Sequence, residues 1–349
     1  MKLITFTNNI NSVIEFDHSG TNNPVLRKNK IIQSLQEKFN TIDITEITDE
    51  IDLQWLKSIH DPDYLRFLKD SHNSFISSSD ISWSSGNNGL IPCNFSKNRP
   101  HSSVPIYKLS GFYGSDIMTP IYANTWHNAM ISANQAYLGA TYLNSHVGDL
   151  VYILATSPGH HAKRSEYGGY CFINNAIVAA HKLIELGNKK VGILDLDFHA
   201  GNGTYEMARD DPNIVAYSLH CDPTYDYPSF DGFADEYNYV LPPHCDWQTY
   251  KNCLIKVCEK MVFDNINVLI IAFGGDTFKE DPDAISIGRF CLDLSSYTEM
   301  GQIIRQYFHT KPIMITQEGG YNMDHIGDIL SLFITGLGGH GDTPLTPFF

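Results

Sequence analysis

The sequence lacks the features that mark secreted and membrane proteins. Its seven cysteines are scattered singly without a CxxC pair, and no secretory signal opens the chain, a pattern typical of reduced thiols in a cytoplasm-like compartment. No apolar run approaches the roughly 20 residues that span a bilayer. We therefore expect a soluble, cytoplasmic protein without a membrane partner; a protein delivered into a host cell would have the same features.

Basic residues are also few. The 24 Lys and Arg residues face 39 Asp and Glu residues, which gives a net charge of -15. Because affinity for phosphate depends on clustered Lys and Arg, this balance argues against a general nucleic-acid binder. It permits a cationic substrate without requiring one. With 42% hydrophobic and only 18% charged residues, the chain can bury a large core.

The 349 residues show no internal repeat and no linker that divides the chain. Long α/β folds often remain one domain at this length, so we expect a single domain over residues 1–349. Asp61 and Pro62 predict the start of a helix. Residues 71–105 are rich in Ser, Asn and Gly or lack periodicity, which predicts an irregular loop insertion at the surface.

Strand patterns alternate with helical patterns along the rest of the chain. Apolar runs predict strands at 2–6, 150–155, 191–195, 214–219, 268–273 and 313–316. Apolar spacing of three and four predicts helices from residue 125 and at 31–39, 175–186, 247–263 and 296–307. This alternation predicts an α/β fold with a mainly parallel sheet covered by helices on both faces.

Polar clusters follow several of the predicted strands. His160-His161, Asp197 to His199, Gly274-Gly275-Asp276 and Glu318 to Tyr321 each come after one of them. Ligands of open parallel sheets bind beyond the carboxyl ends of the strands. The four clusters therefore favour a functional site at that edge.

Asp195, Asp197 and His199 alternate where the strand at 191–195 ends. Because side chains of a strand have period two, the three share one face. Carboxylates and an imidazole suit a divalent metal of borderline softness. The alternative is that the acids cap the strand end and the histidine is solvated.

Asp197, His199 and Asp276 would leave one coordination position open, as catalytic zinc sites do. The tandem histidines suit the roles of general base and acid, because imidazole titrates near neutrality. Tyr321 follows two glycines and could donate a hydrogen bond to an oxyanion.

Five motifs resemble the zinc-dependent histone deacetylase family, and most closely its bacterial acetylpolyamine amidohydrolase branch. They are Pro158-Gly159-His160-His161-Ala162, the run Gly169 to Ala176, the run Asp195 to Thr204, Gly275-Asp276-Thr277-Phe278 and Glu318-Gly319-Gly320-Tyr321. The resemblance extends from about Ile59 to the C-terminus in the same motif order. It implies the arginase/deacetylase fold, with a parallel sheet of about eight strands, and zinc-dependent hydrolysis of an N-acyl amine.

The resemblance also implies a role for each matching residue. Asp197, His199 and Asp276 correspond to the ligands of one Zn²⁺ per chain. His161 corresponds to the general base and acid, and Tyr321 to the group that polarises the carbonyl. His160 corresponds to the neighbouring electrostatic histidine.

Further positions correspond to the surroundings of that centre. By this correspondence Asp195 would orient His160, and Asn202 stands at the position that pairs with His161, where some members have aspartate. A structural K⁺ or Na⁺ would be held by Asp195, Asp197, His199, Ser218 and Leu219. The substrate tunnel would be lined by Tyr170, Tyr227, Gly169 and Gly319.

The chain departs from the polyamine branch at two positions. Tyr107 and Met118 stand where those relatives have glutamates that hold the ammonium groups of the substrate. Asp116 and Asp80 are candidates to replace them. An acetylpolyamine and an acyl-lysine peptide therefore both remain candidate substrates, and the 71–105 loop predicts a homodimer as in that branch.

Two rival functions differ in class. A ureohydrolase on the same fold would need further acidic ligands for a second metal, which the run Asp195 to Asn202 does not supply in the usual arrangement. A catalytically inactive acyl-lysine binding module would not need the two histidines and Tyr321.

Overall fold

The computed structural model describes residues 1–8, 23–40, 42–85, 88–96, 98–229, 235–283 and 288–338. The remaining parts of the predicted domain, including 86–87 and 97 of the predicted insertion, lie outside the described residues.

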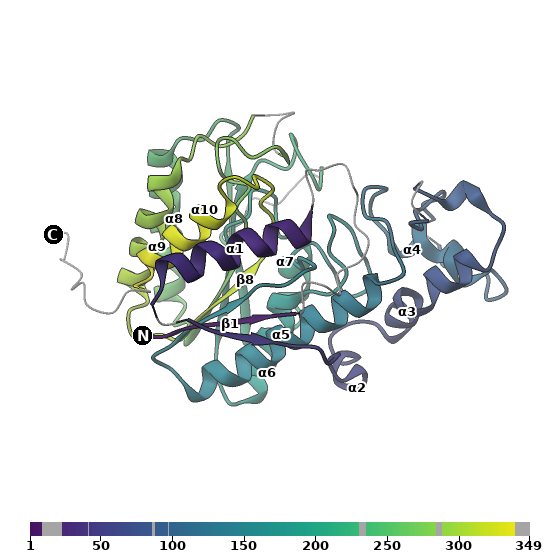
Figure 1. The fold of residues 1–349 in the computed structure, drawn as a ribbon, viewed down its shortest axis with the longest axis horizontal. Coiled ribbons are helices and arrows are strands. Elements are labelled where there is room, and N and C mark those ends of the chain that lie inside the picture. The colour runs from purple at the N-terminus through teal and green to yellow at the C-terminus, as the bar shows by residue number, and fades with distance from the viewer. Residues whose placement is uncertain are drawn as a thin grey trace.

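Eight parallel strands form one sheet inside the main body of the molecule (Figure 1). They are β1 (Leu3–Thr7), β2 (Ile42–Glu46), β3 (Leu150–Ile153), β4 (Val191–Asp195), β5 (Ile214–Cys221), β6 (Asn238–Leu241), β7 (Val268–Phe273) and β8 (Ile313–Gln317). Their order across the sheet is β2-β1-β3-β8-β7-β4-β5-β6. The predicted parallel α/β sheet of about eight strands is therefore confirmed.

Helices cover both faces of the sheet, as predicted. The helices are α1 (Pro24–Lys38), α2 (Leu53–Leu56), α3 (Pro62–Ile76), α4 (Ser110–Tyr113), α5 (Thr125–Ser145), α6 (Asn175–Glu185), α7 (Asn202–Ala208), α8 (Trp247–Phe263), α9 (Leu294–Tyr307) and α10 (Ile326–Gly336). Two short 3-10 helices, η2 (Ile81–Trp83) and η3 (Ile106–Leu109), follow α3. Helices α5 and α6 pack in one hydrophobic cluster, and α1, α8, α9 and α10 pack in another.

Strand β7 shows why both faces are apolar. Ile270 and Ala272 belong to the cluster of α5 and α6, whereas Leu269, Ile271 and Phe273 belong to the cluster of α1 and α8 to α10. Because successive side chains of a strand point to opposite faces, a strand covered on both faces has a continuous apolar run.

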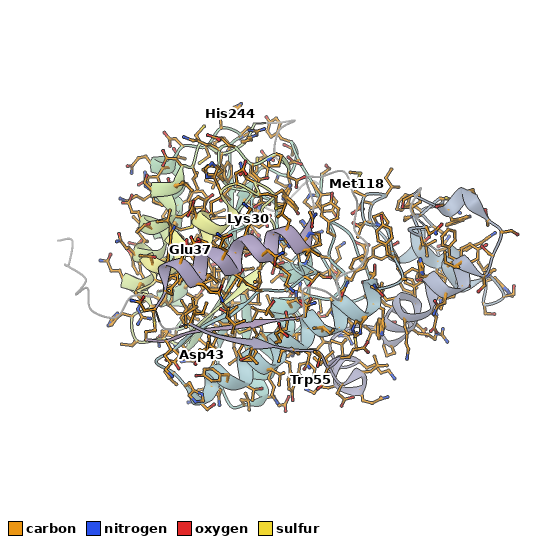
Figure 2. The ribbon with its side chains drawn as sticks, in the orientation of Figure 1. Lys30, Glu37, Asp43, Trp55, Met118 and His244 are labelled. Atoms are coloured by element: carbon orange, nitrogen blue, oxygen red, sulfur yellow. The ribbon has the colours of Figure 1, made fainter. Side chains whose placement is uncertain are left out.

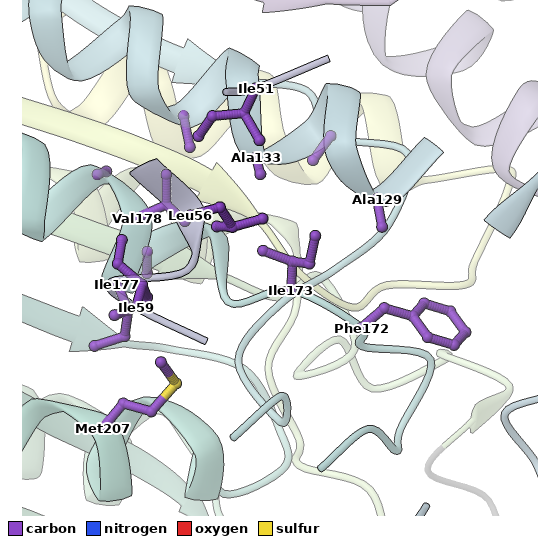
Figure 3. Close-up of a cluster of buried hydrophobic side chains, with 14 of the residues drawn as sticks. Ile51, Leu56, Ile59, Ala129, Ala133, Phe172, Ile173, Ile177, Val178 and Met207 are labelled. Atoms are coloured by element: carbon purple, nitrogen blue, oxygen red, sulfur yellow. The ribbon is translucent and has the colours of Figure 1, made fainter. Parts of the chain in front are cut away.

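The cluster of α5 and α6 joins segments that are distant in the sequence. Figure 3 shows Leu56 of α2 near Ala133 of α5, with Ile177 and Val178 of α6 beside them. Leu56, Ala133, Ile177 and Val178 are all fully buried. This packing holds the chain before β3 against the helices that flank the histidine motif.

One sequence prediction needs correction, two strands were missed, and one helix start is confirmed. Residues 71–76 belong to α3 and not to the irregular insertion, because Phe75 continues the apolar stripe of the helix and packs against Tyr107. Strands β2 and β6 were not predicted, since both lie at sheet edges and neither is buried along its whole length. The predicted helix start at Asp61 is confirmed, because its carboxylate accepts the N–H groups of Asp63 and Tyr64.

Among the described residues, no helix combines the length and apolar character that crossing a membrane requires.

Helix α1 buries a lysine ammonium group in the interior. The Lys28 side chain is fully buried, and its Nζ lies 3.2 Å from Thr156 Oγ1 and 3.4 Å from the carbonyl oxygen of Asn8. Burial, together with the positive charge of Arg27, lowers the pKa of Lys28 to about 7. Between about pH 7 and the ordinary pKa of 10.5, Lys28 is therefore protonated in the unfolded chain and deprotonated in the folded chain.

We expect the free energy of unfolding to rise with pH across this window, because the unfolded state binds more protons there. Below about pH 7 Lys28 is charged in both the folded and the unfolded chain, so the folded protein bears the whole free-energy cost of burying the ammonium group. Urea denaturation is expected to find Lys28→Met more stable than the natural protein at pH 7, with the advantage shrinking by about 2 kcal/mol by pH 9. The exposed Lys30 of the same helix (Figure 2) provides the control Lys30→Met. A difference that did not depend on pH would show that Lys28 keeps its proton when buried.

Candidate metal centre and pocket

The residues predicted to form the site come from adjacent strand ends. His160-His161 follow β3, Glu318 to Tyr321 follow β8, Asp276 follows β7, and Asp195 ends β4. Strands β3, β8, β7 and β4 are neighbours in the sheet. The parallel arrangement therefore gathers four distant segments at one edge.

Asp197, His199 and Asp276 form a compact buried group. Their candidate ligand atoms all lie within 4.8 Å of one another, and His199 Nδ1 lies 3.2 Å from both Asp197 Oδ1 and Asp276 Oδ2. Asp276 Oδ2 is buried without a hydrogen-bond partner among the described residues. Two carboxylates and an imidazole nitrogen that face each other, with one oxygen left unbonded, fit a divalent cation.

Two glycines make this close approach possible. A Cβ atom on Gly274 would collide with the Asp197 carboxylate, and a Cβ on Gly319 would collide with Asp276. The Gly319 N–H instead donates to Asp197 Oδ2 over 2.8 Å. Only residues without side chains fit between the strand ends here.

The electrostatics of the two carboxylates differ. Burial and the negative charge of Asp197 raise the pKa of Asp276 well above its ordinary value. Burial alone would raise the pKa of Asp197 too, but the positive charges of His160 and His199 hold it below the usual range. The pair therefore resists carrying two negative charges unless a cation compensates them.

A second group with metal-binding distances consists of His160, Cys171 and Glu318. The oxygens of Glu318 are already bonded, since Oε2 accepts the N–H groups of Gly159 and His160 over 2.6 and 3.1 Å and Oε1 accepts the Thr316 hydroxyl over 3.0 Å. We assign this group to holding the loop of His160 in place.

The tandem histidines have different partners. His160 Nδ1 lies 3.1 Å from Asp195 Oδ2, whereas His161 Nδ1 lies 2.8 Å from Asn202 Oδ1. Burial opposes the charged form of His160, but Asp197 and Asp195 raise its pKa to about 10. Burial and the charge of His160 lower the pKa of His161 well below its ordinary value. His160 is therefore the charged member of the pair and His161 the neutral one.

The neutral His161 is suited to accept a proton. When its Nδ1–H donates to Asn202 Oδ1, Nε2 is left as the acceptor. His161 also contacts the Tyr227 ring edge to face, with 4.7 Å between the centroids. This contact fixes the plane of the imidazole beside the pocket.

Tyr321 is held at the pocket by its backbone. Its N–H donates to Asp281 Oδ2 over 2.7 Å, and it follows Gly320, whose φ of +113° favours glycine. Burial raises the pKa of the Tyr321 hydroxyl well above its ordinary value. The hydroxyl is therefore a neutral hydrogen-bond donor at physiological pH.

The residues predicted to hold a monovalent cation also lie together. The β4–β5 register pairs Asp195 with Ser218, which Leu219 follows. Asp195 Oδ1 accepts the N–H of Asp197 over 3.1 Å, and the Ser218 hydroxyl lies 2.7 Å from His220 Nδ1. The ends of β4 and β5 thus bring Asp195, Ser218 and Leu219 close to Asp197 of the metal group.

A pocket opens onto the metal group and contains every tunnel residue predicted from the sequence. It is lined by Asp116, Met118, Pro158, His160, His161, Gly169, Tyr170, Asp197, His199, Asp226, Tyr227, Asp283, Gly319 and Tyr321. Gly169 and Tyr170 both have positive φ, of +53° and +65°. Asp116 supports this turn, because its Oδ2 accepts the Gly169 N–H over 2.8 Å.

The residues at the positions of the two missing glutamates, and the acids considered as their replacements, differ in whether they line the pocket. Tyr107 is buried against Trp83 and Phe75 and does not line the pocket. Asp80 is also absent from the lining, because it bonds Ser82 and pairs with Lys108. Met118 does line the pocket and projects at the surface (Figure 2).

Sequence reasoning missed Asp226 and Asp283 as pocket residues. Asp226 Oδ1 and Asp283 Oδ2 lie 3.9 and 4.0 Å from His199 Nε2. Both residues lie in loops several residues beyond the end of a strand, where no periodic pattern predicts which way a side chain points. The only available signal was that each is an acid in a loop that follows a site strand.

Comparisons with known proteins agree with this site. The sequence profile of the Histone deacetylase domain matches residues 23–337. Acetylpolyamine amidohydrolase 2 of Pseudomonas aeruginosa is 33% identical over 287 residues, which cover 79% of this chain and 80% of the relative. Acetylpolyamine amidohydrolase of Mycoplana ramosa is 31% identical over 300 residues, which cover 82% and 84%.

The fold also has a solved counterpart. The crystal structure of acetylpolyamine aminohydrolase from Burkholderia pseudomallei superposes with a TM-score of 0.84 at 23% identity, over 97% of this chain and 99% of that one. At this identity the likeness concerns the fold, which is the one expected from the sequence.

Proposed function

The chain belongs to the histone deacetylase family, and from this premise we propose that it removes the acetyl group from a small amine that keeps a free ammonium group, as an acetylpolyamine does. Its membership makes it a hydrolase of the deacetylase type. The substrate is the part of the proposal that rests on the pocket.

The observation that carries the substrate proposal is the charge of the pocket wall. Asp116, Asp226 and Asp283 line the pocket in addition to Asp197, and Lys and Arg are absent from the lining that the described residues form. Asp226 Oδ2 is buried without a hydrogen-bond partner among those residues. Carboxylates in such a wall favour a cation, because an opposite charge offsets their desolvation.

The position of these acids suits an ammonium a few bonds from the amide. Asp226 and Asp283 lie near the outer nitrogen of His199, so they flank a substrate whose amide has reached the metal group. A diamine acetylated at one end presents its ammonium there. An acyl-lysine in a peptide presents a neutral backbone at a similar distance.

We propose Asp197, His199 and Asp276 as the ligands of one zinc ion, a choice that their donor types and the unbonded Asp276 oxygen support. Zinc in such a site polarises a substrate carbonyl as a Lewis acid. His161 and Tyr321, which both line the pocket, would supply the proton transfer and the hydrogen bond.

His161 would accept the proton of the attacking water at Nε2 and later deliver it to the leaving amine. Its low pKa leaves it unprotonated at the start. Tyr321 would donate its hydroxyl hydrogen to the carbonyl oxygen as negative charge develops there. The charge on His160 favours the same oxyanion.

Three further assignments belong to this proposal. Residues 1–349 form one deacetylase domain, which the match over 23–337 supports. Asp195, Ser218 and the neighbouring backbone hold a K⁺ or Na⁺. Ile76 and Phe95, each half exposed at or beyond the end of α3, support a homodimer through this region.

Kinetics on acetylputrescine, acetylspermidine and an acetyl-lysine peptide test the substrate. We expect kcat/KM to be highest for an acetylpolyamine. Asp283→Asn is expected to lower kcat/KM for acetylputrescine about tenfold, the factor that corresponds to about 1.4 kcal/mol, and to leave the peptide nearly unchanged. The loss arises because the ammonium of the diamine loses a nearby carboxylate.

Glu280→Gln is the matched control, because it removes the same charge from an exposed position of the same loop outside the pocket. The metal content of each variant is measured in parallel. A tenfold preference of the natural protein for the peptide would overturn the polyamine assignment.

One observation favours the acyl-lysine peptide as a second candidate. Ile117 and Met118 are 57% and 64% exposed beside the pocket, and an apolar rim suits contact with a peptide. The same three substrates distinguish the two candidates.

A further inference from the structure

Asp281 stands out as a buried carboxylate that takes no direct part in the chemistry described above. It lies on the loop after β7, five residues beyond Asp276, and is fully buried. Its partners are backbone N–H groups. Oδ2 accepts the N–H groups of Tyr321 and Asn322 over 2.7 and 3.0 Å, and Oδ1 accepts that of Asp283 over 3.0 Å.

We propose that Asp281 is a positioning residue that sets the backbone of Tyr321 and of Asp283 relative to the metal group. Through Tyr321 it acts on the hydroxyl that polarises the carbonyl. Through Asp283 it acts on the acid that we assign to ammonium recognition, and this second part rests on the proposed function.

The loop that carries Tyr321 needs such an anchor. Gly319 and Gly320 precede the tyrosine and have no side chain to pack, so the chain is free to turn there. The earlier part of the loop is held from two sides, by the Gly275 N–H to the Gly319 carbonyl over 3.0 Å and by Arg27 Nη1 to the Glu318 carbonyl over 3.1 Å. Asp281 holds the next peptide units, which carry Tyr321 itself.

The loop that carries Asp281 is itself well fixed. The Asp281 N–H donates to the Phe278 carbonyl over 3.0 Å, and the Lys279 N–H donates to the Leu292 carbonyl over 2.9 Å. Asp276 lies at the start of this loop. The carboxylate of Asp281 therefore ties the catalytic tyrosine to the same short segment that contributes a metal ligand.

The charge of Asp281 suits this role. Burial raises its pKa to about 6, while the N–H groups of Tyr321, Asp283 and Asn322 work in the opposite direction. The group is mostly ionised at neutral pH and can accept from all three donors. Asparagine has nearly the same shape, but its NH₂ group cannot accept a hydrogen bond from an N–H.

Asp281→Asn tests the proposal. We expect kcat to fall about tenfold or more, because a displacement of a catalytic group by about 1 Å can cost a factor of 100. The same substitution in a Tyr321→Phe background is expected to cost less than threefold, since the hydroxyl that it positions is already gone. Equal losses in the two backgrounds would overturn the proposal.

Amide hydrogen exchange supplies a readout that needs no substrate. We expect faster exchange at Tyr321 and Asn322 in Asp281→Asn, and unchanged exchange in the interior of α10. The control Asp246→Asn removes a carboxylate that accepts the Thr249 N–H at the start of α8, and it is expected to leave both kcat and these amides unchanged. Unaltered exchange at Tyr321 in Asp281→Asn would contradict the proposal.

Asp281→Glu provides a second variant if the asparagine protein does not fold. It keeps the charge but moves the carboxylate by one methylene, and we expect it to lower kcat in a folded protein. The kinetic measurements use whichever of acetylputrescine or the acetyl-lysine peptide the natural protein hydrolyses faster. Failure of the polyamine assignment therefore leaves the result for Tyr321 interpretable.

Discussion

Replacement of Tyr321 by phenylalanine is expected to lower kcat about 100- to 1,000-fold, the cost of removing one donor from an oxyanion site. Tyr321 is only 8% exposed, and phenylalanine keeps its ring, whose centroid lies 6.3 Å from that of Tyr170. The substitution removes only the hydroxyl. Because the raised pKa of Tyr321 keeps this hydroxyl protonated, its removal deletes one hydrogen-bond donor. Steady-state kinetics on the preferred acetylated amine measure the effect.

The metal content and the thermal unfolding temperature of Tyr321→Phe should stay close to those of the natural protein, because the hydroxyl is not among the proposed ligands. Tyr239→Phe, which removes a hydroxyl from the edge strand β6 outside the pocket, is the control and should keep full activity. Full activity of Tyr321→Phe would remove the carbonyl-polarising role from this residue.

Replacement of Asp276 by asparagine is expected to abolish metal binding and to lower kcat/KM at least about 1,000-fold. The carboxylate oxygen that faces His199 and Asp197 becomes part of a neutral amide, so one of two acidic ligands is gone. Elemental analysis of the purified variant measures the metal per chain. Chelation of the natural protein should produce the same loss of activity and be reversed by added zinc.

The same substitution is expected to stabilise the metal-free protein. Without a metal ion, burial and the negative charge of Asp197 disfavour the charged form of Asp276, and the neutral asparagine removes this cost. Thermal unfolding in chelator should therefore occur about 2 °C higher in Asp276→Asn than in the natural protein, the shift expected for about 1 kcal/mol. Asp246→Asn is the control for loss of a carboxylate elsewhere.

A variant that kept one metal ion per chain would contradict the assignment of Asp276 as a ligand. A metal-free variant that was less stable than the natural protein in chelator would instead contradict the cost of burying Asp276 beside Asp197 without a metal ion. The two measurements thus separate the role of Asp276 in binding from its effect on the fold.

Residues near a strand end could be placed from the sequence. Asp197 and His199 alternate directly after β4, so the period of a strand predicts their common face. Two residues separate Asp276 from the end of β7, and three separate Tyr321 from the end of β8. Most of them are glycine, and such short connections keep both side chains close to the edge of the sheet. The parallel sheet and its helices could be predicted for a similar reason, because buried strands have continuous apolar runs.

Residues in longer loops could not be placed in this way. Asp226 and Asp283 stand five and ten residues beyond the ends of β5 and β7, and each residue of a loop adds two free dihedral angles. Asp281 reads as an ordinary loop acid until the hydrogen bonds to Tyr321 and Asn322 are known. In the sequence, nothing distinguishes Lys28 from Lys30 and Lys38 of α1, although Lys28 alone of the three is fully buried.

The sequence by itself determined the strands, their apolar faces and the chemistry of the side chains at their ends, because these depend on local spacing and residue type. Only the tertiary structure decided the order β3-β8-β7-β4, which brings His161, Tyr321, Asp276 and Asp197 together. It also decided which acids face the pocket and which lysine is buried. These outcomes depend on how distant segments pack against one another, and local spacing does not contain that information.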